Sequence, residues 1–208
     1  MKIDFRYYSK NRNKLLILIK KFPSKDQSRI LMALDLASEY HKNQKRSEED
    51  AEKAGYIIHC VRTARWLLEN KVTNVDLICA AILHDTLEDT TLTDKEILRS
   101  FNKSTLNFIQ AVTRPRRAGE TEAEKKINKP KHMERIIRST KKVRILKTAD
   151  LLDNMRSWIL LSKKHKKYYK FPRWVNEAEK FYIPIAQSIS LNATKEMRGI
   201  LRSIKKLH

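Results

Sequence analysis

Apolar residues recur at intervals of three and four along most of the chain, which is the spacing of one helix face. Between residues 24 and 42, Ile30, Leu34 and Ala37 supply such a face. Ser24 is placed to cap this helix, with Gln27 as its capping-box partner. The same reasoning predicts helices over residues 15–21, 24–42, 56–69, 74–85 and 104–112, a short helix capped by Thr91 or Thr93, and helical runs over 133–161 and from 175 onward.

Residues that break helices are scarce, with Gly present 3 times and Pro 5 times in 208 residues. Tight hairpins therefore have little room, and we predict an all-α fold of about 8 to 10 helices in a single domain. One stretch differs: residues 114–131, "RPRRAGETEAEKKINKPK", are highly charged, contain two prolines and lack an apolar period. We predict a long mobile loop there.

The chain is strongly basic, because Lys and Arg outnumber Asp and Glu by 45 to 24, a net charge of +21. Such an excess favours polyanionic partners, namely nucleotides, nucleic acid or an anionic membrane surface. A lysine-rich solvated surface without any such partner explains the charge equally well, since net charge governs association and not fold.

Two features indicate a cytoplasmic protein without a membrane anchor. Cys60 and Cys79 are the only cysteines, and both fall in predicted helices, so we expect reduced thiols. The apolar run at residues 15–19, "LLILI", is too short for a signal sequence or a membrane span.

The stretch "AAILHDTLEDT", residues 80–90, begins as a buried helix and then places four ionisable groups within six positions. His84 and Asp85 end the apolar segment, and adjacent helical residues differ by about 100°. Both side chains can therefore line one cleft. Glu88 and Asp89 follow Asp85 by three and four positions, so they lie near its face if the helix continues for one more turn.

Two other predicted helices also direct polar groups toward the interior. His59 lies on the apolar stripe that continues to Trp66, where a histidine is more often a core residue than a ligand. Residues 145–157, "ILKTADLLDNMRS", carry a polar strip on a helix otherwise rich in Ile, Leu and Met. The strip consists of Ala149, Asp150, Asp153, Asn154 and Ser157.

Burying several carboxylates close together is costly unless they are neutralised. Arg and Lys partners are one solution, and the chain has many of them. A metal ion is the other solution, because imidazoles and carboxylates together form a mixed nitrogen and oxygen site suited to Mn²⁺, Fe²⁺ or Zn²⁺. The residue pattern by itself leaves both solutions open.

The ordered set of His59, the His84-Asp85 pair and Asp150, placed on separate helices, resembles the metal-binding pattern of the HD-domain phosphohydrolase superfamily. The match becomes closer around these residues. "HDTLEDT", "NQKR", "YIIH", "LKTADLLDNMRS" and "FYIPIA" resemble motifs of the hydrolase domain of Rel/SpoT enzymes and stand-alone small alarmone hydrolases. The resemblance runs from about Ile30 to Ser190.

The resemblance implies an enzyme that removes the 3′-pyrophosphate from (p)ppGpp, giving GDP or GTP and pyrophosphate. It implies one Mn²⁺ ion, with Zn²⁺ or Fe²⁺ as alternatives, held by four metal ligands: His59, His84, Asp85 and Asp150. Glu88 and Asp89 would be the catalytic pair that positions and deprotonates water. The nucleotide would contact four further residues: Arg46, Tyr56, Asn154 and Ser157.

Within this resemblance, residues 27–195 form the hydrolase domain, 1–26 a basic N-terminal extension or helix, and 196–208 a basic C-terminal helix or tail. Several positions depart from the family pattern. The segment after Arg46, "SEEDAEKAG", is longer than usual and acidic, and Leu151 and Asp153 replace Arg and His. These departures leave the preferred base open.

Two alternatives remain beside the alarmone hydrolase. One is an HD-domain nucleotidase or phosphatase acting on another 3′-phosphorylated nucleotide, such as a (p)ppApp-like molecule or NADPH. The other is a basic, non-catalytic protein that binds RNA or another polyanion through "KKHKKYYK", residues 163–170, where two tyrosines can stack on bases. Intact metal ligands favour the enzyme. The oligomeric state is left open.

Overall fold

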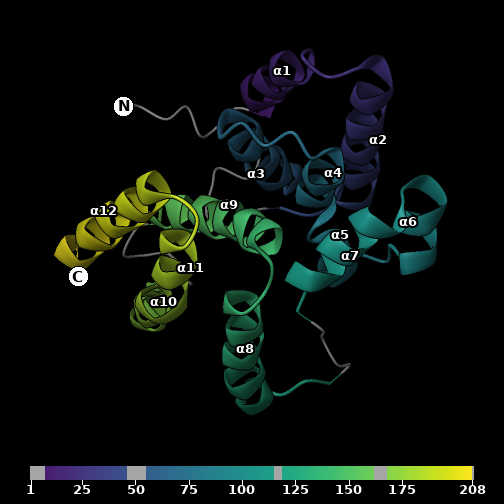
Figure 1. Cartoon of the computed structure of the whole chain (residues 1–208). Coiled ribbons are helices and arrows are strands. Elements are labelled where there is room, and N and C mark those ends of the chain that lie inside the picture. Colours follow the sequence, from purple (N-terminus) through teal and green to yellow (C-terminus); the bar gives the residue numbers. More distant parts are fainter. Residues whose placement is uncertain (1–7, 46–54, 115–118, 162–167, 208) are drawn as a thin grey trace. The chain divides into compact units, whose positions relative to one another are not determined.

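The structure, a computed structural model, describes residues 8–45, 55–114, 119–161 and 168–207. Every regular element in these ranges is helical, which confirms the predicted all-α fold (Figure 1). Within the same ranges no helix is long and apolar enough to cross a membrane. The helices fall into two compact units, Met1–Arg116 and Arg117–His208.

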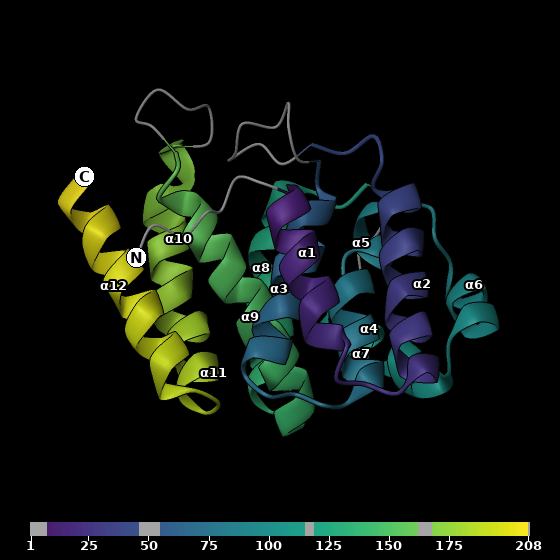
Figure 2. The same ribbon diagram turned by 90° about the horizontal axis from the view of Figure 1, so that it is seen from above.

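The first unit is built around a short, almost entirely apolar helix, α4. Residues 77–83 of α4 are all buried, and the helix packs against α2, α3 and α7, while α1 packs on α3 (Figures 1 and 2). Burial on all sides explains why this segment has no polar face. The helices of the unit are α1 (Tyr8–Ile19), α2 (Ser24–Tyr40), α3 (Ile57–Glu69), α4 (Val75–Leu83), α5 (Thr86–Asp89), α6 (Asp94–Ser100) and α7 (Lys103–Val112).

Side chains cap several of these helices. Asn74 caps α4 and Asn102 caps α7, while Thr93 forms a capping box with Glu96 at the start of α6, which confirms Thr93 as its cap. The capping role predicted for Ser24 is wrong. Ser24 is already the first residue of α2, where Pro23 precedes it and no side chain caps the helix.

Helix α3 ends in an unusual turn. The amide of Val72 donates to the carbonyl of Leu67 at 3.0 Å, and the amide of Lys71 donates to that of Leu68 at 3.1 Å. These two bonds define a Schellman motif, whose residue past the cap normally is glycine because its backbone is left-handed. Here that residue is Lys71, with φ 62°.

The second unit packs around α11, which contacts α8, α9 and α12 (Figure 2). The rings of Trp158 and Trp174 stack at 5.3 Å between their centroids and fasten α10 to the end of α9. Its elements are α8 (Glu122–Ile137), α9 (Lys141–Trp158), a 3₁₀ turn η1 (Tyr168–Lys170), α10 (Phe171–Glu177), a π-helical turn η2 (Ala178–Tyr182), α11 (Ile183–Gln187) and α12 (Leu191–Leu207).

The loop predicted over residues 114–131 is wrong from residue 122 onward, because α8 begins there. Thr121 accepts from the amide of Glu124, and the Glu124 carboxylate accepts from the Thr121 amide, so a capping box starts the helix. Pro130 lies within the helix, and buried Met133 and Ile136 anchor the helix's last turns. The run predicted over 133–161 is also two helices, separated at residues 138–140.

Candidate metal centre

His59 lies in the first turn of α3, a helix in which ten residues are buried, including its central run. The imidazole itself is 1% exposed. Its Nε2 atom lies 3.2 Å from Nε2 of His84. His59 is therefore both a core residue and one half of a pair of facing imidazoles, so the two interpretations of its position on the apolar stripe are compatible.

His84 is presented by the C-terminal end of α4. Its Nδ1 donates to the carbonyl of Ala81 at 2.9 Å, which places the proton of the neutral ring on Nδ1. Nε2 then carries a lone pair that faces His59. An imidazole oriented by a backbone carbonyl in this way is the usual state of a metal-binding histidine.

Asp85 completes a triangle of candidate ligand atoms within the first unit. Its Oδ2 lies 3.2 Å from Nε2 of His84 and 3.5 Å from Nε2 of His59. Bonds of about 2.1 Å to a shared cation would separate neighbouring ligand atoms by about 3.0 to 3.4 Å. Two of the observed separations, both 3.2 Å, lie within this range and the third, 3.5 Å, lies just above it, so the arrangement suits a first-row divalent ion.

Tyr56 and Arg46 are the two residues of the first unit predicted to contact a nucleotide. The Tyr56 hydroxyl donates to Oδ2 of Asp85 at 2.6 Å, a contact that the sequence pattern did not indicate. It fixes the rotamer of the carboxylate from outside the triangle. Arg46 lies outside the described residues.

Glu88 and Asp89 follow on α5, a single helical turn. The amides of both residues donate to the carbonyl of Asp85, at 3.2 and 2.8 Å, so the predicted extra turn is confirmed. Since the turn begins at Asp85, the two carboxylates are attached to the same short piece of backbone as a candidate ligand. Their positions therefore depend directly on how α5 is held.

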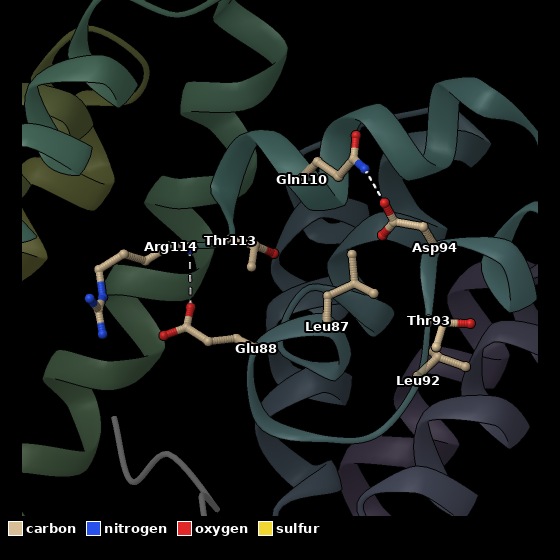
Figure 3. Close-up of a pocket in the computed structure, with 8 residues that line it drawn as sticks. All are labelled: Leu87, Glu88, Leu92, Thr93, Asp94, Gln110, Thr113 and Arg114. Atoms are coloured by element: carbon tan, nitrogen blue, oxygen red, sulfur yellow. Dashed lines mark hydrogen bonds between the residues drawn. The ribbon is translucent and has the colours of Figure 1, made fainter. Parts of the chain in front are cut away.

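Glu88 borders a cavity of about 540 Å³ on α5, α6 and α7 (Figure 3). Its Oε2 accepts from the backbone amide of Arg114 at 3.2 Å, and across the cavity Gln110 donates to Asp94 at 2.6 Å. Leu87 and Leu92 form part of the wall between these polar groups. A hydrogen bond from backbone fixes the Glu88 carboxylate more firmly than a flexible side-chain partner would.

Asp150 belongs to the second unit, where it lies on α9 and is 4% exposed. Its Oδ2 pairs with Nζ of Lys147 at 2.8 Å, and its Oδ1 accepts from the Asn154 amide at 2.6 Å. A lysine partner is the neutralising arrangement considered for the polar strip. Asp150 thus has a cationic side chain beside it.

The rest of the polar strip on α9 is also directed inward. Asp153 and Ser157 are each 1% exposed, and the Ser157 hydroxyl donates to the carbonyl of Asp153 at 3.1 Å. Ser157, one of the predicted nucleotide contacts, therefore bonds to its own helix in this structure. Asn154, the other, is only partly buried and orients Asp150.

A model of the family described as "HD domain" matches residues 33–188, well over half of the chain. This chain belongs to the HD-domain family. The match covers the helices that carry all the candidate metal ligands, so it confirms the superfamily resemblance inferred from the His59, His84-Asp85 and Asp150 pattern.

Two similar relatives are named guanosine-3′,5′-bis(diphosphate) 3′-pyrophosphohydrolase MESH1. The one from Xenopus tropicalis is 37% identical over 64% of this chain and 71% of its own length. The one from Homo sapiens is 31% identical over 63% of this chain and 70% of its length. A longer guanosine-3′,5′-bis(diphosphate) 3′-pyrophosphohydrolase from Aquifex aeolicus is 31% identical over 80% of this chain but only 22% of its own length.

A solved structure has the same HD-domain fold. It is described as a metazoan ortholog of SpoT that hydrolyzes ppGpp, and it aligns with a TM-score of 0.73 over 90% of this chain and 99% of its own. At 21% identity this likeness establishes the fold.

Proposed function

We propose that this chain is a metal-dependent hydrolase that removes the 3′-pyrophosphate from (p)ppGpp, releasing GDP or GTP and pyrophosphate. One observation carries the proposal: three ligand atoms converge within 3.5 Å, and one helical turn further on the chain presents Glu88 and Asp89. Membership of the HD-domain family and relatives that bear the corresponding name support it.

The proposed ligand set is His59, His84 and Asp85, joined by Asp150 from the second unit. The two histidines and Asp150 are buried, and each offers one ligand atom. Asp150 also pairs with Nζ of Lys147 at 2.8 Å, so in this proposal its carboxylate is shared between that ammonium group and the ion. Mn²⁺ is the proposed ion, and when bound it would lower the pKa of a water molecule and offset negative charge on the phosphate oxygens.

The protein's own groups then have separate tasks. Glu88, held by the amide of Arg114, and Asp89 orient the attacking water and accept its proton. The Tyr56 hydroxyl keeps Asp85 in the ligand rotamer. We assign contacts with the nucleotide to Arg46, Tyr56, Asn154 and Ser157, the last after its hydroxyl turns away from the helix carbonyl.

The direct test is to incubate the purified protein with Mn²⁺ and a panel of nucleotides and to measure both pyrophosphate and phosphate release. The panel contains (p)ppGpp, its adenosine counterpart and NADPH, because the preferred base is the least constrained part of the proposal. We expect pyrophosphate and GDP or GTP from (p)ppGpp. Intact (p)ppGpp after several hours would refute the proposed activity.

The double variant Glu88→Gln, Asp89→Asn tests the assigned catalytic roles. Loss of a general base typically costs about 10²- to 10⁴-fold in turnover, so we expect at least the lower figure. Mn²⁺ affinity, measured by calorimetry, should stay close to that of the wild type. Asp35→Asn, which changes an exposed acid on α2, is the matched control and should retain full turnover.

A further inference from the structure

His41 is a buried histidine that the proposed chemistry does not use. It caps the C-terminal end of α2 and continues the apolar stripe of Ile30, Leu34 and Ala37 at helical spacing. The residue is 1% exposed, and its ring Nε2 has no hydrogen-bond partner among the described residues. Leaving a buried polar atom unpaired costs free energy, so a hydrophobic residue would be more stable at this position. The presence of histidine therefore suggests that its other ring nitrogen makes an important contact.

The other ring nitrogen contacts Gln44. Nδ1 of His41 lies 2.7 Å from Oε1 of Gln44, and Nε2 of Gln44 donates to the backbone carbonyl of Asp89. Because the Gln44 amide nitrogen is engaged by a carbonyl, its oxygen faces His41 and accepts the Nδ1 proton. His41 therefore sets the orientation of the amide that holds the last residue of α5.

A second connection runs from the same histidine to the other end of α5. The ring of Tyr56 packs against that of His41 with 4.9 Å between centroids, and the Tyr56 amide donates to the carbonyl of Gln44 at 2.9 Å. The Tyr56 hydroxyl donates to Asp85, the residue that precedes α5. One end of the turn is thus held through Gln44, and the other through Tyr56.

External support of this kind matters because α5 has only four residues. A single turn is unstable by itself, since nucleation fixes several backbone angles for one hydrogen bond. The turn nevertheless carries a candidate metal ligand at its start and two candidate catalytic acids at its end. Their mutual orientation must be imposed by neighbouring residues.

We propose that His41, Gln44 and Tyr56 form a clamp that fixes α5, and that His41 is a positioning residue for the reaction. This inference rests on the proposed function, because it assigns the clamp to orienting Asp85 relative to Glu88 and Asp89. His41 touches neither substrate nor ion in this role. It acts through the amide of Gln44 and the ring of Tyr56.

The test compares two substitutions of His41. Asn places an amide nitrogen near the position of Nδ1 and retains the donor to Gln44, whereas Leu fills the space without a donor. We expect His41→Leu to lower kcat by about 10- to 100-fold, the size expected for a small misplacement of catalytic groups. KM and Mn²⁺ affinity should change by less than about threefold, and His41→Asn should recover most of kcat. Equal kcat in the two variants would overturn the proposal.

Gln44→Met provides a second variant in case His41→Leu fails to fold. It removes the donor to the Asp89 carbonyl, and Gln44 lies outside α2, so the substitution leaves that helix intact. Gln27→Met is its matched control. Gln27 likewise donates its side-chain amide to a backbone carbonyl, that of Phe22 at 2.8 Å, but at the start of α2. We expect reduced kcat only for Gln44→Met, and equal losses in both variants would contradict a specific clamp.

A measurement without substrate separates this inference from the proposed function. The amides of Asp89 and Thr90 donate within the turn, at 2.8 and 3.1 Å, so their hydrogen exchange reports on how firmly α5 is held. We expect faster exchange in His41→Leu and Gln44→Met than in His41→Asn. Unchanged exchange would refute the clamp even in an active enzyme, and faster exchange would support it even if (p)ppGpp is not the substrate.

Discussion

Asp76 and Asp85 lie at opposite ends of α4 and are almost equally buried, with side-chain exposures of 19% and 18%. Their surroundings nevertheless differ. Asp76 accepts hydrogen bonds from Arg29 at 2.5 Å and from Asn102 at 2.9 Å. The partners of Asp85 include a phenol and two imidazoles. One acid is neutralised by a permanent cation, while the other belongs to a group of donor atoms arranged like metal ligands.

The direction of the helix strengthens this contrast. Asp76 lies in the first turn of α4, where the helix dipole stabilises a negative charge. Asp85 lies two residues beyond the last residue of α4, where the same dipole disfavours one, and only the single turn of α5 begins there with the opposite effect. Burial alone would raise the pKa of Asp76, but hydrogen bonds from Arg29 and Asn102 outweigh it, so that pKa lies below its ordinary value. Asp76 thus supports the fold, whereas Asp85 is the acid that we propose as a metal ligand.

The largest expected difference between the two acids is in turnover. Asp85→Asn should reduce hydrolysis by at least about 100-fold, because it removes a proposed metal ligand. Asp76→Asn should retain activity but lower the free energy of unfolding by about 1 to 3 kcal/mol, because Arg29 loses its charged partner. Turnover assays and urea titrations of both variants measure the two effects. A fully active Asp85→Asn variant would show that Asp85 is not needed as a metal ligand.

The next effect concerns metal binding and thermal stability. Mn²⁺ at about 100 times its dissociation constant should stabilise the folded protein by about 2.7 kcal/mol, and a chelator should reverse this. We expect the rise in Tm in the wild type and in Asp76→Asn, but not in Asp85→Asn. Scanning calorimetry with and without the ion measures it. A similar rise in all three proteins would place the ion elsewhere.

A smaller effect distinguishes the two acids by pH. Because the pKa of Asp76 is lower in the folded protein than in the unfolded chain, this residue contributes stability above the unfolded value of about 3.9. The contribution is lost as the pH falls through the lower, folded value. The stability difference between the wild type and Asp76→Asn should therefore be constant above about pH 5 and shrink in acid. Denaturant titrations from pH 3 to 7 test this trend.

The smallest expected effect is on the reactivity of a cysteine thiol near Asp76. Sγ of Cys79 lies 3.7 Å from the carbonyl of Arg29, the residue that pairs with Asp76. Burial raises the pKa of the Cys79 thiol to about 12. At pH 8 only about one thiol in 10⁴ is then ionised, so alkylation of the native protein should be very slow. Peptide mass spectrometry after iodoacetamide treatment measures this. Rapid native labelling of Cys79 would show that the packing around the middle of α4 opens readily.

The sequence predicted most helices of the first unit because its apolar periods and caps agree. The period of α7 and the Thr93 cap of α6 are examples. The prediction from the sequence failed at α8. The high charge and Pro130 favoured a loop there, although the residues of a capping box are present in the sequence. The burial of Met133 and Ile136 stabilises that helix. Such packing depends on tertiary structure and is not visible in local composition.

The candidate site was predictable only as far as its motif. His59, His84 and Asp85 converge as the resemblance implied, because His59 lies in the first turn of α3, His84 and Asp85 follow the last residue of α4, and α3 packs on α4. The contacts of Tyr56 and Gln44 with Asp85 and Asp89 were not predictable. Gln44 and Asp89 are 45 positions apart and meet only because α2 and α4 pack together. The side chains that orient a site come from such long-range packing, which a pattern of spacings does not contain.

The left-handed Lys71 at the end of α3 implies that this protein is less stable than its fold allows. A residue with a Cβ in that conformation costs about 1 to 2 kcal/mol relative to glycine, and Lys71 is exposed and far along the helix from His59. Natural sequences tend to lie only slightly above the stability that selection requires, and such positions are where stability is readily gained. A chain with glycine at this turn is therefore a suitable background in which destabilised variants can be purified and compared on equal terms.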